Sequence, residues 1–476
     1  MNKRIASLLL ATAFCSQPIF AEQIWTIGNN DNSAKGFALA PDKYKDYLAH
    51  DFGYEDRYFL IGHSDAEKDF PYIIPGPSDG WGGTGGTSGW RTHETTILFG
   101  IEKMPSSSEQ WKLVIDVLDN AVELPPLLKV TVNGEMWKFQ LPKGKNKNSI
   151  TGDLSGTTEN RIEIPVNPEC LHEGGNEIRL SVLQGSWIMF DQVMLEGPSG
   201  VSLVKPGKAF VRNVKAAEYE LKDNGNSVQP LLVDVEELSG RPNLEVELDG
   251  KKVFSQRLDT ARYILEAPMP AVKADKKSNY VVKADGKVIA KGSVTRSQKP
   301  EQTLADYVDT RIGTGHSRWM IAPGPWMPFS MVKLSPDNQN SGWQSGYQPT
   351  FENIGCFSHI HEWTLGGLGL MPTNGKLVIQ EGDEADPDSG YRSRIDKRTE
   401  KAGIGYYAIN LEDYDIKAEL TATTRCGFQR YTFPTDREGA RILVDLHIPT
   451  EYDYMLREVE LRRVNDYRIE GVSHQL

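Results

Sequence analysis

The sequence predicts an all-β protein built from tandem β-sandwich modules. Beyond its first two dozen residues, the chain is a succession of short runs rich in β-branched and aromatic residues, bounded by Gly, Pro, Asn and Asp. This pattern is typical of sandwiches, whereas long apolar stretches of helical period with caps would indicate helices. Tryptophan is unevenly spread: six of the ten lie in residues 25–187, four in 319–363 and none between. The chain therefore divides into regions.

The first predicted module covers residues 23–198. Residues 24–28 (IWTIG) suit an opening strand, and residues 127–132 are followed by Asn133–Gly134. Asn-Gly favours the positive φ angles of a two-residue hairpin turn. Residues 171–182 and 185–196 are predicted to be the closing strands of this sandwich.

Residues 199–298 are predicted to form a second sandwich of immunoglobulin-like size that acts as a spacer. This region has no tryptophan, and it is rich in lysine. Asp249–Gly250 and Asp285–Gly286 are hairpin signals of the same kind. A linker is expected at 297–301.

A third unit, at residues 304–476, is predicted to be a partial β-sandwich. Tyr407, Ile409 and Leu411 alternate with their neighbours, a turn is expected at 412–415, and alternation resumes at Ile416. Residues 442–446 suit another strand, and 457–471 suit one or two more.

The amino terminus predicts secretion. A basic start is followed by an apolar core of ten residues (5–14) and by Ala21, which suits cleavage of a signal peptide at 1–21. The apolar run is too short for a membrane span. Secretion or a periplasmic location follows, with lipid anchoring through Cys15 as the less favoured alternative.

Composition limits the classes of molecule that the protein could bind. The net charge of −12 argues against nucleic acid, whose phosphates need a basic surface. After cleavage the cysteines are Cys170, Cys356 and Cys426, without the spacing of a metal site. Buried thiols are expected, with a Cys356–Cys426 bridge as the alternative.

Trp81 and Trp90 lie in a glycine-rich loop that formally contains G-x-G-x-x-G at residues 80–85. A nucleotide site would need a strand before this motif and a helix after it, and loop residues are found on both sides. The two tryptophans are candidate glycan contacts, with plain packing as the alternative.

His359 and His361 are two residues apart, so regular strand geometry would point both side chains to one face. Three interpretations remain: a metal pair helped by Asp337 or Glu362, residues lining a substrate cleft, or core side chains with satisfied hydrogen bonds.

Several segments of the third unit resemble one enzyme family in their order and spacing. They are residues 304–315 (LADYVDTRIGTG), 328–337 (PFSMVKLSPD), 345–347 (SGY), 355–361 (GCFSHIH), 371–375 (MPTNG) and 416–425 (IKAELTATTR). Together they resemble the amino-terminal half of glycoside hydrolase family 92, the calcium-dependent exo-α-mannosidases. Both ends of the first module resemble the galactose-binding-like modules of rhamnogalacturonan lyases.

The family 92 resemblance implies an α-mannoside substrate, hydrolysis with inversion and an oxygen-ligated calcium. It also implies that the catalytic carboxylates and calcium ligands belong to a helical barrel, which this chain lacks, so no catalytic residue is assigned and the chain alone is expected to be inactive. Trp343 would form an aromatic wall at the substrate, with Tyr347, His359 and His361 beside it.

The sequence therefore predicts the amino-terminal portion of a secreted exo-α-mannosidase that acts on mannose-containing glycans, without nucleic acid or a membrane span. A non-catalytic carbohydrate-binding protein is the alternative. An open apolar face on the last unit is also expected, and with it poor solubility.

Overall fold

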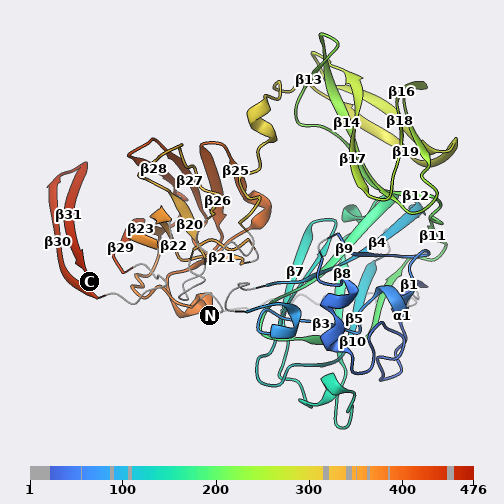
Figure 1. Ribbon diagram of the computed structural model, residues 1–476, viewed down its shortest axis with the longest axis horizontal. Coiled ribbons are helices and arrows are strands. Elements are labelled where there is room, and N and C mark those ends of the chain that lie inside the picture. The colour runs from blue at the N-terminus through green and yellow to red at the C-terminus, as the bar shows by residue number, and fades with distance from the viewer. Residues whose placement is uncertain are drawn as a thin grey trace, which may run out of the picture.

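The computed structural model describes residues 22–54, 56–85, 91–105, 110–314, 321–338, 346–349, 351–361, 365–383, 386–447 and 455–476. The expected all-β architecture is confirmed: β-sheets form three successive modules (Figure 1). The longest helices in these ranges have four residues, α1 (Ala66–Asp69) and the 3-10 helix η6 (Leu304–Tyr307). The other described 3-10 turns are η1 (Tyr44–Asp46), η2 (Leu48–His50), η3 (Gly80–Gly82), η4 (Ser149–Thr151), η5 (Pro168–Cys170), η8 (Pro387–Ser389) and η9 (Lys397–Thr399).

Two sheets form the first module. One has the order β1 (Glu22–Gly28), β10 (Ile188–Gly197), β5 (Trp111–Asn120) and β8 (Asn160–Val166), with β3 (Ile73–Ile74) beside β10. The other has the order β11 (Ser202–Leu203), β4 (Glu94–Lys103), β9 (Gly174–Gln184), β6 (Leu127–Val132) and β7 (Glu135–Gln140), with β2 (Tyr58–Leu60) parallel to β4.

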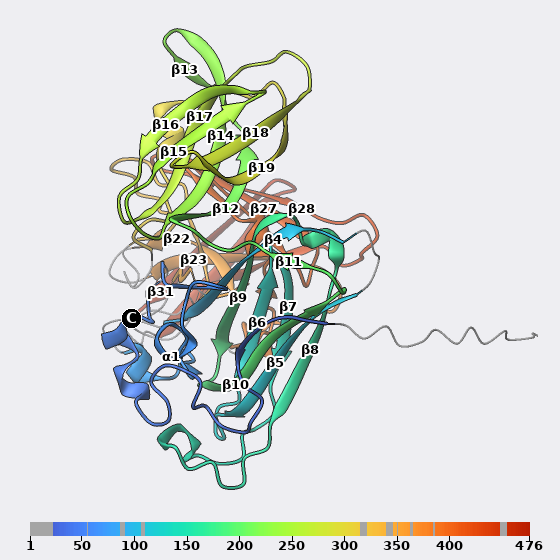
Figure 2. The same ribbon diagram turned by 90° about the vertical axis from the view of Figure 1, so that its right-hand side faces the viewer.

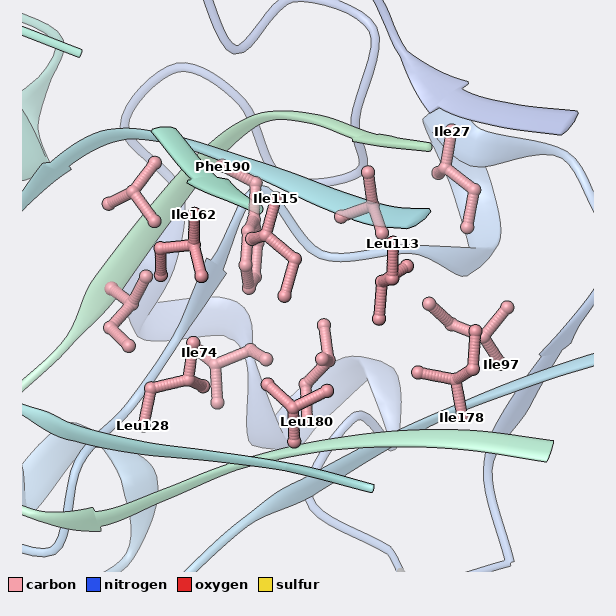
Figure 3. Packing of buried hydrophobic residues seen from close by; sticks show 14 of the residues in the cluster. Ile27, Ile74, Ile97, Leu113, Ile115, Leu128, Ile162, Ile178, Leu180 and Phe190 are labelled. Carbon is pink, nitrogen blue, oxygen red and sulfur yellow. The ribbon is translucent and has the colours of Figure 1, made fainter. Parts of the chain in front are cut away.

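The core of the first module lies between these sheets (Figure 3). Leu113, Ile115 and Phe190 project from one sheet toward Leu128 and Leu180 of the other, and all five are fully buried. The alternation along β6, with every second residue buried, supplies one wall of this core. The predicted hairpin is confirmed, because Val132 pairs with Glu135 across a turn in which Asn133 and Gly134 have φ of 46° and 90°.

Two four-stranded sheets form the second module. Their orders are β12 (Ala209–Ala216), β14 (Asn226–Glu237), β13 (Leu221–Asp223), with β17 (Arg262–Pro270) beside β14, and β16 (Lys251–Arg257), β15 (Asn243–Leu248), β18 (Lys276–Ala284), β19 (Lys287–Arg296). Both Asp-Gly hairpins are confirmed.

The second module packs directly on the first, with β12 beside β9 (Figure 2). Phe210 joins Leu60 and Leu98 in a small buried cluster. Arg212 forms ion pairs with Glu177 of the first module and Glu236 of its own. These contacts fix the two modules against each other.

The third module has two four-stranded sheets. Their orders are β20 (Ser335–Asp337), β22 (Cys356–His361), β23 (Leu365–Thr373), β29 (Arg441–Asp445), and β25 (Lys401–Gly403), β26 (Tyr406–Leu411), β27 (Ile416–Ala422), β28 (Gly427–Thr432). β21 (Asn353–Ile354) pairs with β24 (Ser393–Arg394), and β30 (Leu456–Asn465) pairs with β31 (Arg468–Gln475). The predicted meander is confirmed, since Leu411 pairs with Ile416 across the turn.

The β30–β31 hairpin stands apart from the two larger sheets of the third module (Figure 1). Every residue of β30 is exposed, including Leu461, and Ile469 of β31 is exposed as well. The hairpin thus presents apolar side chains to solvent, as the sequence predicted for this unit.

Candidate functional site

His361 sits in a fully buried polar group at the end of β22. Its Nδ1 donates a hydrogen bond to the carbonyl oxygen of Lys333 at 2.6 Å, and its Nε2 lies 2.6 Å from Asp337 Oδ1 and 3.2 Å from Ser358 Oγ. A carbonyl oxygen only accepts, so the Nδ1 must carry a proton. Nε2 therefore faces the Asp337 carboxylate and the Ser358 hydroxyl. Hydrogen bonds at both ring nitrogens therefore fix His361 beside Asp337 within the core.

His359 has different partners. Its Nδ1 lies 3.0 Å from the carbonyl oxygen of Leu368, and its Nε2 lies 3.1 Å from the Gln429 amide nitrogen. The β22–β23 pairing shifts register between Ser358 and Ile360, and this bulge interrupts the alternation on which the shared-face expectation relied. Burial lowers the pKa of His359, so the neutral imidazole is favoured there.

Tyr347 lies in the interior of the third module, with 1% of its surface exposed. Its hydroxyl donates to Glu400 Oε1 at 2.8 Å and accepts from Lys397 Nζ at 3.1 Å. Tyr407 donates to the same Glu400 oxygen at 2.8 Å. Burial, followed by the Glu400 charge, raises the pKa of Tyr347 far above its usual value. In this arrangement Tyr347 orders a buried carboxylate, and its ring supports the Lys397 ammonium 4.9 Å away.

Trp81 belongs to η3 and is half-buried. Its ring packs edge-on against Tyr44 and Tyr47, with centroids 5.2 and 5.8 Å apart. These contacts are those of the packing alternative weighed for this residue. Trp343 and Trp90, together with Glu362, lie outside the described residues.

The thiol prediction needs correction. All three cysteines of the described residues are free, so Cys356 and Cys426 form no bridge. Only Cys356 is buried, because it lies inside β22, whereas Cys426 is exposed in the turn before β28. Burial raises the pKa of the Cys356 thiol well above its usual value, which makes it unreactive.

A charged contact between the first and third modules went unpredicted. Glu352, next to β21, forms ion pairs with Lys129 of β6 and Lys138 of β7. Burial acts to raise the pKa of Glu352, but the two ammonium groups outweigh it and the pKa lies below its usual value. Arg398 adds a hydrogen bond to the carbonyl oxygen of Gly134 at 3.4 Å. The β6–β7 hairpin is therefore docked on the third module (Figure 1).

Three carboxylates with largely buried side chains in the third module are occupied by such contacts. Asp337 is held by His361, Glu352 by two lysines, and Glu400 by two tyrosines. An acid or base for hydrolysis must instead face the substrate with a free oxygen. These three side chains instead bind partners within the protein.

A calcium site would need several oxygen ligands close together. Within the described ranges, no group of three or more His, Cys, Asp or Glu residues is arranged to hold a metal ion. Asp388 of η8 is paired with Arg394 at 2.8 Å. The described residues thus offer no calcium site of their own, and the calcium ligands that the resemblance implies were expected in the helical barrel rather than in these modules. The same ranges contain no helix long and apolar enough to cross a membrane.

Two of the three modules match models of known families. Residues 307–475 match the glycosyl hydrolase family 92 N-terminal domain. Residues 23–195 match a carbohydrate-binding-module-like family described as polysaccharide lyase family 4, domain III.

Individual relatives cover part of the chain. A protein of Arthroderma benhamiae, named an uncharacterised secreted glycosidase, is 31% identical over 157 residues, which are 31% of this chain and 20% of that protein. A family 92 α-mannosidase from Bacteroides thetaiotaomicron, solved with mannoimidazole, is 32% identical, covers 37% of this chain and 23% of its own, and has a TM-score of 0.34. A second structure of that enzyme has 32% identity, covers 37% and 24%, and has a TM-score of 0.33.

The chain spans about a fifth of the length of the curated relative that it matches. Its third module is similar to the amino-terminal domain of glycosyl hydrolase family 92, and its first module is similar to a carbohydrate-binding-module-like domain.

Proposed function

We propose that this chain is the amino-terminal, non-catalytic portion of a secreted exo-α-mannosidase that removes mannose from glycans with inversion. The match of residues 307–475 to the family 92 N-terminal domain carries this proposal. Two relatives support it: a protein named as a secreted glycosidase and a solved α-mannosidase of the same family.

Inversion sets the chemistry that the whole enzyme must supply. One carboxylic acid protonates the leaving oxygen while a carboxylate activates water on the opposite face, with about 6.5–9.5 Å between the two groups. The buried carboxylates Asp337, Glu352 and Glu400 are bound to histidine, lysines and tyrosines, so we assign neither role to them. We likewise assign no role in binding calcium, the ion that the resemblance implies, to these three carboxylates.

The test begins with the gene. The genomic DNA beyond the Leu476 codon is sequenced, and the product of any continuing frame is expressed alongside this chain. Both are incubated with α-linked mannobiose, and the anomeric protons of the released mannose are followed by NMR. We expect β-mannose first from the longer product and no hydrolysis by this chain.

Other results would contradict the proposal in distinct ways. Initial release of α-mannose would overturn inversion, and turnover by this chain alone would overturn its non-catalytic role. A stop codon followed by an unrelated gene would favour the second candidate, a carbohydrate-binding protein. That candidate is supported by the match of residues 23–195 and predicts glycan binding without turnover.

A further inference from the structure

A cavity of about 350 Å³ lies between the first and third modules. The first module contributes side chains from β6, β7 and the end of β9, including Gln140. The third contributes residues around β21, β24 and η8, including Pro387 and Arg394. Ligand cavities start at about 300 Å³, so this one suits a ligand of one or two sugar rings. We call it the intermodule cleft.

Both cations among the described lining residues are already paired. Lys138 Nζ lies 2.5 Å from Glu352 Oε2. Arg394 contacts Asp388 at 2.8 Å and Asp413 at 3.1 Å. An anionic ligand would have to displace these carboxylates and leave them close together, which is unfavourable. A neutral ligand faces no such penalty, so the charge arrangement selects against uronic acids and phosphates.

The remaining lining suits an amphipathic neutral ligand. Leu183 and Phe351 provide apolar surface, and the side chains of Gln140, Gln184 and Asn353 line the same cavity. Internal hydrogen bonds hold two of these amides in place: the Gln140 nitrogen donates to the carbonyl oxygens of Pro125 and Pro126, and the Asn353 oxygen accepts from Arg392. Sites for small polar ligands combine an apolar lining with a few polar groups that fix orientation. A sugar ring has the matching surfaces, with C–H groups on its faces and hydroxyl groups at its edge.

We propose that the intermodule cleft is a binding site for a short segment of neutral glycan, held by both modules at once. The site is formed by docking of the β6–β7 hairpin, which the Glu352 ion pairs and the Arg398 hydrogen bond hold against the third module. The choice of mannose as the sugar rests on the proposed function, whereas the preference for a neutral ligand does not.

Calorimetry on the whole chain tests the cleft with three probes: α-mannotriose, cellotriose and trigalacturonate. We expect a neutral trisaccharide to bind and trigalacturonate not to bind. The variant Gln140→Trp places a large side chain at the cleft from an exposed position at the end of β7, and should weaken binding at least about 10-fold. Gln256→Trp, at an exposed position on β16 of the second module, is the matched control and should bind normally.

The outcomes separate the two proposals. Binding of cellotriose but not mannotriose, lost in Gln140→Trp, would support the cleft and count against mannose as the substrate. Failure of both neutral probes to bind, equal binding of trigalacturonate, or unchanged binding by Gln140→Trp would overturn the cleft. If Gln140→Trp lowers the Tm, Pro387→Trp blocks the same cavity from the third module and is subject to the same criteria.

A last experiment changes the charge at the intermodule cleft. Asp388 is largely exposed, and Asp388→Asn removes one of the two carboxylates that neutralise Arg394. This variant should acquire measurable affinity for trigalacturonate while it retains the neutral probe. If it still rejects the anion, the role of charge pairing in ligand choice is overturned.

Discussion

The first and third modules are both β-sandwiches, but their interiors are held together differently. The first is closed around a continuous apolar core that both of its sheets line (Figure 3). The third has a smaller apolar core and adds a buried polar network to it. In this network Arg392, with no exposed side-chain surface, contacts Asn353, Glu381 and the carbonyl oxygen of Asn338. Apolar cores tolerate repacking, whereas buried polar networks depend on every partner being present.

The largest effect should come from the core of the first module. Phe190→Ala removes a fully buried ring and leaves a cavity, which should cost about 3–5 kcal/mol of unfolding free energy. Phe428→Ala on β28 of the third module, where 66% of the residue is exposed, should change it by less than about 0.5 kcal/mol. Chemical denaturation followed by fluorescence and circular dichroism measures both. Equal losses would break the comparison.

The contact between the two modules ranks next. Glu352→Gln leaves Lys129 and Lys138 without their shared carboxylate, and loss of one partner of a buried pair costs about 3 kcal/mol. We expect the calorimetric transitions of the first and third modules to move apart in temperature. Asp466→Asn removes an exposed pair with Arg463 and should leave the thermogram unchanged. A single unaltered transition in Glu352→Gln would show that the contact does not couple the modules.

A smaller loss is expected within the polar interior of the third module. Tyr347→Phe keeps the ring but removes one of the two tyrosine hydroxyls that bind Glu400, and should cost about 1–3 kcal/mol. Tyr467→Phe, at a residue that is 99% exposed, serves as the control. Urea denaturation compares the two. If Tyr347→Phe proves neutral, the Glu400 network contributes little to stability.

The pH dependence of the first module should show a still smaller effect. Burial, with Asp116 nearby, raises the pKa of Glu159 to about 7. A carboxyl whose pKa is raised on folding binds its proton more tightly in the folded state. Its contribution is therefore complete below the ordinary pKa near 4.5 and is lost as pH rises through 7.

Glu159→Gln should remove this decline and make the variant more stable than the parent at pH 8. Because the side chain is partly exposed, we expect a difference of about 1 kcal/mol or less. Denaturation midpoints at pH 4.5 and 8 measure it. A parent whose stability rises across this interval while the variant stays flat would contradict the assignment.

The smallest effect on stability should come from the β30–β31 hairpin. Leu461→Lys and Ile469→Lys replace exposed apolar side chains, so the unfolding free energy should hardly change. Solubility should increase, since exposed apolar strands promote association. Light scattering over a concentration series compares this double variant with the parent. Unchanged association would show that the hairpin is not the adhesive surface.

Sequence reasoning worked where structure depends on neighbours along the chain. The hairpin turns at Asn133–Gly134, Asp249–Gly250 and Asp285–Gly286 follow from local backbone preferences, and each was found where expected. The alternation in β26 and β27 likewise identified buried positions correctly. These features need no knowledge of tertiary contacts.

Features that depend on distant partners were not accessible in this way. Lys129 and Glu352 are 223 positions apart, and neither residue type is expected to be buried before its partner is known. The bulge in β22 gave His359 and His361 separate partners, although their spacing predicted a shared face. For Tyr347, the neighbouring sequence gave no indication of the Glu400 carboxylate that binds it.

Through the docking of β6–β7 against Glu352, the first and third modules contact each other although the second separates them in sequence (Figure 1). Because the modules belong to one chain, the contact between them is intramolecular and forms at a higher effective concentration than a contact between separate proteins. An interface too weak to assemble from separate proteins can therefore persist here. The second module and the segment after it would then serve as a tether. The distance that this tether can span, more than any side chain it carries, would decide whether the first and third modules stay in contact.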